Sequence, residues 1–254
     1  LADMFGGGFG EAGAEVVIEE FLEGEEASFF AITDGETILP FGTAQDHKQV
    51  GEGDVGPNTG GMGAYSPAPV LTSELQARVI DEIIRPTVDT MRAEGMPYSG
   101  VLYAGLMLTA DGPKLIEYNC RFGDPECQAV MPLVQGDFAG FCSEGAQGKL
   151  DSELLEFDNG WSVCLILASA GYPESSRSGD VISGLEKLDQ VQVFHAGTRK
   201  NDKGNWETNG GRVLAVVAGA EQRLDAVDAA YTELKKIEFD GAQMRSDIGR
   251  ANFN

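Results

Sequence analysis

The sequence predicts an α+β fold with a mixed or antiparallel sheet and flanking helices. The first reason is a pair of strand-like runs, residues 101–108 and a second run from Lys114, joined by a Gly-Pro turn signal. The second is a hairpin pattern, in which Asp34-Gly35 separates residues 27–32 from residues 37–40. The third is a β-rich stretch after residue 160 that closes with one helical pattern.

Composition excludes two classes of partner. The 254 residues include 18 Lys and Arg against 41 Asp and Glu, a net charge of -23, which repels nucleic acid and anionic membrane. Hydrophobic residues make up 42%, enough for a sizeable core, and no apolar run is long enough to cross a bilayer. The cysteines at 120, 127, 142 and 164 form no C-x-x-C pair, so we expect them reduced, mostly buried and in a cytoplasmic protein.

The N-terminal region shows a Gly-rich stretch followed by strand patterns. Residues 1–14 are poorly patterned and typical of a surface loop, and residues 16–22 predict a strand. The chain opens Leu1-Ala2-Asp3, which suggests part of a longer protein. The acidic cluster at residues 23–26 is either a solvated turn or a hinge whose backbone pairs with a flat heterocycle while a carboxylate holds a ribose hydroxyl.

A long glycine-rich loop follows. Residues 51–63 hold six glycines, which let a backbone approach a ligand closely and turn its N–H groups toward it. A flexible linker is the alternative, but Asn58, Thr59 and Met62 are atypical of linkers, and loops this long inside a domain are usually functional. Ser73 with Gln76 then predicts a capped helix that Pro86 breaks or kinks.

The strand from Lys114 carries a polar face. Side chains alternate along a strand, so Glu117, Asn119 and, if the strand persists, Arg121 share one side. Carboxylate and amide oxygens suit a hard cation such as Mg²⁺, and a guanidinium suits phosphate. The alternative is an exposed edge with ordinary polar residues; the apolar strand before it favours a metal–phosphate site, because buried polar groups need partners. Asp124-Pro125 predicts an N-cap and the first position of a helix.

The last hundred residues predict a smaller β-rich unit. An acidic connector at 150–160 marks a boundary, and strands are expected at 161–170, 191–196 and 212–218. His195 and residues 208–212 could face a ligand, although a structural histidine and a tight turn are the commoner interpretations. The helical spacing from Leu224 to Leu234 predicts core packing.

Several strings together resemble the phosphoribosylamine–glycine ligase (glycinamide ribonucleotide synthetase) family of the ATP-grasp superfamily. The resemblance runs in order along nearly the whole chain, and its matching segments are residues 17–28, 45–48, 56–67, 102–107, 116–126, 171–173, 194–198 and 208–214. The resemblance implies an N-terminally truncated ATP-grasp fold, with residues 1–20 as the tail of the small lobe, 21–150 as the catalytic core and 151–254 as the C-terminal domain.

The resemblance also implies a reaction and its residues. The family joins glycine to 5-phosphoribosylamine through a glycyl phosphate, using ATP and Mg²⁺ (or Mn²⁺), in purine biosynthesis. The implied roles are, for metal, Glu117 and Asn119; for catalysis, Arg121, Asp46 and Lys48; for nucleotide, Glu19, Glu20, Leu22 and Glu26; and for substrates, His47, Asn58, Thr59, Gly60, Gly61, Met62 and Gly63. We expect a monomer that is inactive alone, because the phosphate-gripping lobe of the family lies ahead of these residues.

Two other functions stay open. One is a different ATP-grasp carboxylate–amine ligase, which the strings at 46–48 and 58–63 disfavour. The other is a non-catalytic fragment that serves as a binding or assembly module. Gln49 departs from the family pattern, where arginine is common.

Overall fold

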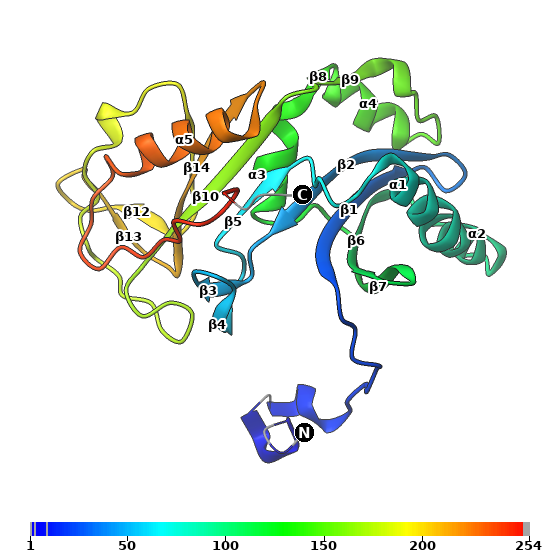
Figure 1. The fold of residues 1–254 in the computed structure, drawn as a ribbon, viewed down its shortest axis with the longest axis horizontal. Helices are drawn as coiled ribbons and strands as arrows, with labels where there is room; N and C mark the ends of the chain where they lie inside the picture. The colour runs from blue at the N-terminus through cyan, green and yellow to red at the C-terminus, as the bar shows by residue number, and fades with distance from the viewer. Residues whose placement is uncertain (1, 3, 9, 251–254) are drawn as a thin grey trace.

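An eight-stranded antiparallel sheet runs through the molecule and carries the rest of the chain (Figure 1). The computed structural model describes residues 2, 4–8 and 10–250. In order across the sheet, the strands are β11 (Gln192–His195), β14 (Arg212–Ala220), β10 (Trp161–Ala168), β5 (Gly63–Ser66), β2 (Ile38–Asp46), β1 (Glu25–Thr33), β6 (Gly100–Thr109) and β7 (Gly112–Asn119). The predicted fold class is confirmed.

Shorter elements decorate this sheet. Three two-stranded ribbons are β3 (Gln49–Gly51) with β4 (Val55–Asn58), β8 (Val134–Gly136) with β9 (Leu155–Phe157), and β12 (Thr198–Lys200) with β13 (Trp206–Thr208). The α-helices are α1 (Ser73–Val79), α2 (Arg85–Ala93), α3 (Glu126–Val130), α4 (Phe138–Gly145) and α5 (Arg223–Leu234). Single helical turns lie at Met4–Gly8, Gly10–Ala14, Ile80–Ile84, Met131–Leu133, Ser152–Leu154 and Leu185–Lys187.

Alternation along β1 explains why helices cover both faces of the sheet. Phe29 and Ala31 pack with α1 and α2, whereas Phe30 and Ile32 pack with α3 and α4. Each neighbouring pair of side chains points to opposite faces, so a strand that is apolar throughout is buried on both sides. The predicted hairpin after β1 is confirmed, since the Asp34 carboxylate accepts hydrogen bonds from the N–H groups of Glu36 and Thr37.

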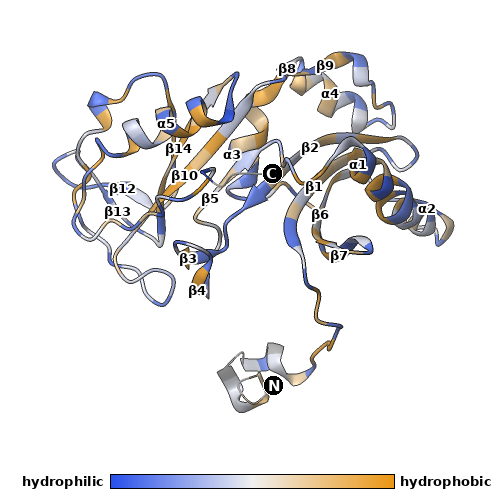
Figure 2. Cartoon of the chain, viewed as in Figure 1, coloured by the Kyte–Doolittle hydropathy of each residue, from blue (hydrophilic) through white to orange (hydrophobic). Residues whose placement is uncertain are grey.

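The C-terminal half extends the same sheet. Figure 2 shows hydrophobic residues running along β10 and β14, and α5 lies over them with Val227, Tyr231 and Leu234 buried. β5 joins the two halves because it pairs with β2 on one side and β10 on the other. The proposed division at residue 150 stays a prediction, but the sheet is continuous across it.

Several local expectations are wrong. Residues 16–22 form no strand, and Val17, Ile18 and Phe21 are 86%, 75% and 90% exposed, because no strand among the described residues pairs with them. Figure 1 shows this segment leading away from the body toward the N-terminus. The expected loop at 1–14 instead contains two helical turns in its described part.

Two predicted helix starts differ from those in the structure. Thr72, not Ser73, caps α1 by accepting a hydrogen bond from the N–H of Leu75 (3.3 Å). Pro86 does accompany a break, since a π-helical turn at Ile80–Ile84 separates α1 from α2. Asp124 does not cap α3; the helix begins at Glu126, after the cis Asp124–Pro125 bond.

The cysteines are less buried than expected. None forms a disulfide, but of the four only Cys164 is buried, while Cys120 and Cys142 are exposed. Every described helix is too short or too polar to cross a membrane.

Candidate active site

The metal-ligand pair predicted on β7 shares one face of the strand. The amide Nδ2 of Asn119 donates to the Glu117 carboxylate over 3.2 Å, while Tyr118 points the other way and its hydroxyl donates to the Ile83 carbonyl. The amide oxygen of Asn119 therefore stays available beside a carboxylate, as the alternation predicted. Their metal role stays a prediction.

Arg121 lies outside this alternation. β7 ends at Asn119, and the exposed Arg121 guanidinium donates to the carbonyl of Phe122 over 2.8 Å. The strand does not persist far enough to align Arg121 with Glu117, so the reason for grouping them fails.

Glu117 lines a crevice together with three other residues predicted to belong to the site, Glu26, Asp46 and Lys48. Lys48 Nζ lies 2.7 Å from the Glu26 carboxylate. Burial acts to lower the pKa of Lys48, but the hydrogen bond and charge of Glu26, with the charges of Asp46 and Glu117, raise that pKa overall. Lys48 is therefore a fixed cation among carboxylates.

Asp46 is the last residue of β2 and is half-buried. Its Oδ1 accepts a hydrogen bond from the His47 N–H over 2.7 Å. Burial first, and then the negative charge of Glu126, raise the pKa of Asp46 to about 8. Glu126 is only 3% exposed and is held by the Tyr103 hydroxyl at 2.6 Å. A half-buried carboxylate thus lies near a buried one, and this disfavours ionisation of Asp46.

The glycine-rich stretch is more ordered than a plain loop. Part of the stretch forms β4, its last residue begins β5, and residues 59–62, here called the glycine-rich crossing, connect the two strands. Thr59 N–H donates to the Lys48 carbonyl (2.7 Å), and Met62 N–H donates to the His47 carbonyl (2.8 Å). The crossing residues are therefore fixed to the segment that carries the charged side chains.

Members of this stretch differ in exposure. Asn58 and Gly60 are exposed and Thr59 is half-buried, so they can reach a ligand. Met62 is 1% exposed and its side chain packs in the core of the C-terminal half; the substrate contact expected of it stays a prediction. Gly61, with φ +107°, lies so close to Asp46 that a Cβ would be 2.6 Å from its Oδ1.

His47 is half-buried. Burial and the charge of Arg245 lower its pKa, and its ring lies 5.7 Å from that of Tyr65. Its buried Nδ1 has no hydrogen-bond partner within the described part of the protein. A neutral imidazole with an unused nitrogen is compatible with a substrate contact, which stays a prediction.

Two residues that the sequence interpretation did not assign to the site come from the C-terminal half. Arg212 donates from Nη1 to the carbonyls of Gly60 (2.6 Å) and Asp124 (2.7 Å), and Nη2 lies 3.0 Å from the Asp124 carboxylate. The Tyr172 hydroxyl accepts from the Gly60 N–H over 2.8 Å. In the sequence, Arg212 lies in the string at 208–212, for which a tight turn is the commoner interpretation, and Tyr172 lies in the string at 171–173.

The predicted nucleotide hinge lies apart from these contacts. Glu19 and Glu20 are exposed and Leu22 is half-buried, in the irregular segment before β1. Glu20 forms an ion pair with Lys114 at 2.7 Å. His195 faces its own neighbours, with Nδ1 3.0 Å from the Thr198 hydroxyl, as the structural interpretation expects.

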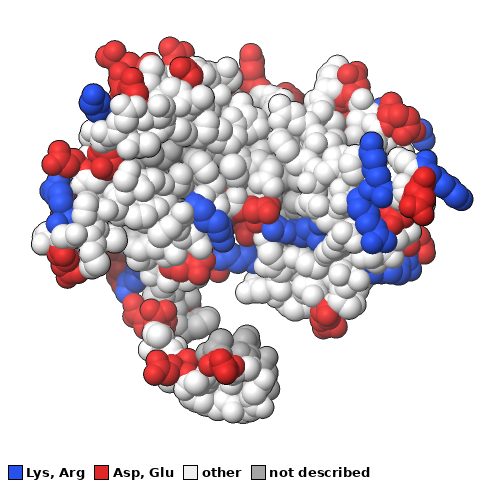
Figure 3. All heavy atoms as spheres, turned by 180° about the vertical axis from the view of Figure 1, so that it is seen from behind, with Lys and Arg blue, Asp and Glu red and all other residues white. Residues whose placement is uncertain are grey.

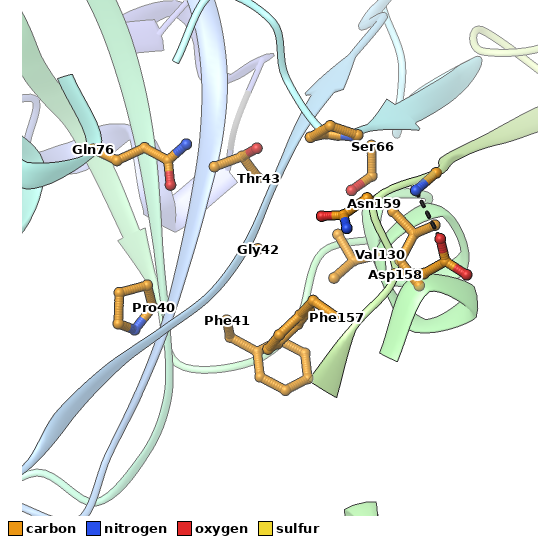
Figure 4. A pocket seen from close by; sticks show the side chains of 13 residues that line it. Pro40, Phe41, Gly42, Thr43, Ser66, Gln76, Val130, Phe157, Asp158 and Asn159 are labelled. Atoms are coloured by element: carbon orange, nitrogen blue, oxygen red, sulfur yellow. Dashed lines mark hydrogen bonds between the residues drawn. The ribbon is translucent and has the colours of Figure 1, made fainter. Parts of the chain in front are cut away.

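Two pockets differ in chemistry. One of about 310 Å³ adjoins the crevice and is lined by charged residues that include Glu26, Asp46 and Lys48. Figure 3 shows lysine and arginine side chains meeting acidic ones near the middle of one face. The other, of about 350 Å³, is seen in Figure 4, with Phe41 and Phe157 among its walls; none of its described lining residues is a lysine or arginine. Only the first suits phosphate.

Comparison with known proteins agrees with this fold and site. Residues 1–127 match the model of the phosphoribosylglycinamide synthetase ATP-grasp (A) domain, and residues 162–251 match the C domain of the same family. The protein is thus of the ATP-grasp class. The solved structure of phosphoribosylamine–glycine ligase from Thermotoga maritima matches with a TM-score of 0.83 and 34% identity over 94% of this chain.

Curated relatives are closer in sequence. Phosphoribosylamine–glycine ligases of Yersinia pestis and Vibrio vulnificus are 52% and 53% identical over 97% and 98% of this chain. The chain belongs to the phosphoribosylglycinamide synthetase family, which confirms the predicted resemblance. It spans 58% and 59% of the length of those relatives, and 60% of the Thermotoga protein.

More distant structures share the fold alone. The biotin carboxylase subunit of pyruvate carboxylase matches with a TM-score of 0.59 and 17% identity. A biotin carboxylase domain from Hydrogenobacter thermophilus, solved with MgADP and bicarbonate, matches with a TM-score of 0.60 and 18% identity.

Proposed function

We propose that this chain is part of an ATP-dependent ligase that joins glycine to 5-phosphoribosylamine, giving glycinamide ribonucleotide, ADP and phosphate. The proposal draws on the family membership and on relatives named phosphoribosylamine–glycine ligase. The observation that carries it is the crevice in which Glu117, next to Asn119, meets Glu26, Asp46 and Lys48.

The donor set at β7 fits Mg²⁺ or Mn²⁺ bound together with nucleotide. The described residues contain no cluster of three or more His, Cys, Asp or Glu that could hold a metal ion by itself. One carboxylate with one amide oxygen leaves positions for water and phosphate oxygens, which is how Mg²⁺ is usually held. Glu117 and Asn119 would hold the ion, which would neutralise charge on the transferred phosphoryl group.

The chain's own residues would do the remaining work. Lys48 would stabilise negative charge on a phosphate or acyl phosphate, because its partners keep it protonated. Asp46, half-buried and close to the glycine-rich crossing, would orient an amine through a hydrogen bond at Oδ2, since Oδ1 already accepts from the His47 N–H. Residues 58–63 would hold glycine and the phosphoribosyl group, and the exposed Asn58 and Gly60 are the most accessible of them.

Nucleotide binding by this chain tests the site directly. Titration with ADP or ATP should show binding that requires Mg²⁺ and that Glu117→Ala abolishes. Glu156→Ala is a matched control, because Glu156 is an exposed strand carboxylate on β9 that lies outside the crevice. Binding that Glu117→Ala leaves unchanged would contradict the assignment and favour a non-catalytic binding or assembly module.

Ligation tests the substrates. A protein completed to the length of the relatives should form glycinamide ribonucleotide only with ATP, glycine and 5-phosphoribosylamine, and this chain alone should be nearly inactive. Preference for another amine acceptor would instead favour a different ATP-grasp ligase. We further propose a monomer in the cytoplasm, to be checked by light scattering and by cell fractionation.

A further inference from the structure

A buried arginine near the C-terminus contacts the hairpin that follows the charged segment. Arg245 is 2% exposed and is among the largest fully buried side chains of the described residues. It belongs to residues 243–249, here called the C-terminal strap, which follow α5 in the chain and contact the β3–β4 hairpin. Long charged side chains are rarely buried unless fully paired, so this position needs explanation.

The arginine is paired on every side of its guanidinium. Nη1 donates to the Asp54 carboxylate (2.7 Å) and to the Gln49 carbonyl (3.1 Å), both in the β3–β4 hairpin. Nε and Nη2 donate to the two oxygens of Asp247 at 2.9 and 2.6 Å. The Asp247 carboxylate in turn accepts from the Gly53 N–H (2.8 Å). One guanidinium therefore ties the strap to β3 and to the turn of the hairpin.

The strap is itself anchored on the C-terminal half. The Tyr231 hydroxyl, on α5, donates to the Arg245 carbonyl (3.1 Å) and accepts from the Ile248 N–H (3.0 Å). Ile248 is fully buried against Gly63, where a Cβ would come within 2.9 Å of its Cδ1. The strap thus contacts the glycine-rich stretch at two places. Arg245 and Asp247 contact the hairpin, and Ile248 contacts the start of β5.

A short covalent and hydrogen-bonded path leads from the hairpin to the proposed site. β3 begins at Gln49, the residue after Lys48, so the Gln49 carbonyl held by Arg245 lies next to the proposed catalytic lysine. The Lys48 carbonyl accepts from both the N–H and the hydroxyl of Thr59 (2.7 Å each). A shift of the hairpin would therefore move Lys48 and the glycine-rich crossing together.

Charge explains why an arginine is needed. Asp54 and Asp247 would repel each other without a cation between them, in a chain whose net charge is already -23. The guanidinium meets three acceptors with fixed planar geometry, whereas an ammonium offers a single charged point.

We infer that Arg245 is a positioning residue, which holds the β3–β4 hairpin in place and thereby sets the geometry of Lys48 and residues 59–62. Its effect on hairpin order is independent of the ligase reaction. Its effect on catalysis rests on the function proposed above.

The first test measures backbone amide exchange in this chain. Arg245→Lys keeps the charge and removes the fork, and Asp54→Asn removes one charge while tolerating the left-handed φ of +54° at that position. Both variants should speed exchange at residues 49–62 about tenfold, the effect of losing one charge-assisted hydrogen bond. Exchange in β10 and β14 should stay unchanged.

The matched control is Asp228→Asn, which breaks the exposed Arg250–Asp228 pair (3.1 Å) at the other side of the strap. It should leave residues 49–62 as slow as in the parent chain. Equal exchange at residues 49–62 in all four proteins, or faster exchange spread evenly over the sheet, would overturn the inference.

The second test uses the ligase completed to the length of its relatives. Arg245→Lys should raise the KM for glycine or 5-phosphoribosylamine about tenfold with a smaller change in kcat, and Asp228→Asn should change neither. Unchanged KM together with faster local exchange would overturn the link to catalysis. Absence of ligation in the parent protein would reject the proposed function, and the exchange result alone would then decide whether Arg245 orders the hairpin.

Discussion

Gly61→Ala is the sharpest single perturbation of the proposed site. Gly61 has a φ of +107°, which L-residues rarely adopt, and its backbone lies between two neighbours. A Cβ there would lie 2.5 Å from Cδ of Pro125 and 2.6 Å from Oδ1 of Asp46. Neither atom belongs to the flexible end of a long side chain, so the clash can be relieved only by moving the glycine-rich crossing.

Two effects add in this variant. Holding alanine at such a φ costs about 1–3 kcal/mol. Inserting a methyl group into a tightly packed position costs roughly another 1–3 kcal/mol. For a chain of this size, where 1 kcal/mol shifts the melting temperature by about 2–4 °C, we expect a fall of roughly 5–20 °C.

Thermal unfolding followed by circular dichroism measures the effect, with Gly204→Ala as the control. Gly204 has a φ of +80° but nothing within 4 Å of its Cβ position, so its variant reports the backbone effect alone. Gly61→Ala should be less stable than Gly204→Ala, and it should also weaken nucleotide binding more. Equal melting temperatures for the two variants would refute the close approach of Gly61 to Asp46.

Two further predictions concern the half-buried carboxylate of Asp46 and the buried carboxylate of Glu126. The pKa of Asp46 is raised to about 8 from 3.8, so the folded state binds this proton more tightly than the unfolded state. The contribution of protonated Asp46 to the free energy of unfolding is therefore full below about pH 4 and is lost as pH rises through 8. Denaturant titrations should show the stability of the parent chain falling relative to that of Asp46→Asn over this range. The expected fall is up to about 1.4 kcal/mol per pH unit. A constant difference would contradict the raised pKa. Tyr103→Phe removes the hydroxyl that donates to buried Glu126 over 2.6 Å, and it should lower the free energy of unfolding by about 1–3 kcal/mol. Tyr118→Phe, at a half-buried position, should lower it less. The reverse order would argue against the buried hydrogen bond between Tyr103 and Glu126.

Local patterns predicted the elements whose signals are local. The Asp34-Gly35 turn is set by side-chain to backbone hydrogen bonds within four residues, and the shared face of Glu117 and Asn119 follows from alternation on one strand. Residues 16–22 show the limit of this reasoning. Their apolar residues favour a strand, but a strand forms only when a second strand supplies hydrogen-bond partners.

Contacts between distant segments could not be predicted in this way. Arg212 and Gly60 are 152 positions apart, and Arg245 and Gln49 are 196 apart. Neither arginine lies in a pattern that points to its partner, because a guanidinium accepts any suitably placed oxygen. The sequence therefore indicated the chemistry of the site from its charged and glycine-rich strings, and left out the residues that hold those strings in place.

The pairing of β5 shows why the C-terminal half matters for the site. β5 follows the glycine-rich crossing directly and pairs through two residues with β2 but through four with β10. Tyr172 and Arg212 then hold both backbone groups of Gly60, also from the C-terminal half. The position of the crossing is thus fixed by residues after 160 as well as by the carbonyls of His47 and Lys48. A change in the relative position of these two halves would change the affinity for a substrate held between them. Mutations in the C-terminal half should therefore alter substrate affinity even where they touch no ligand.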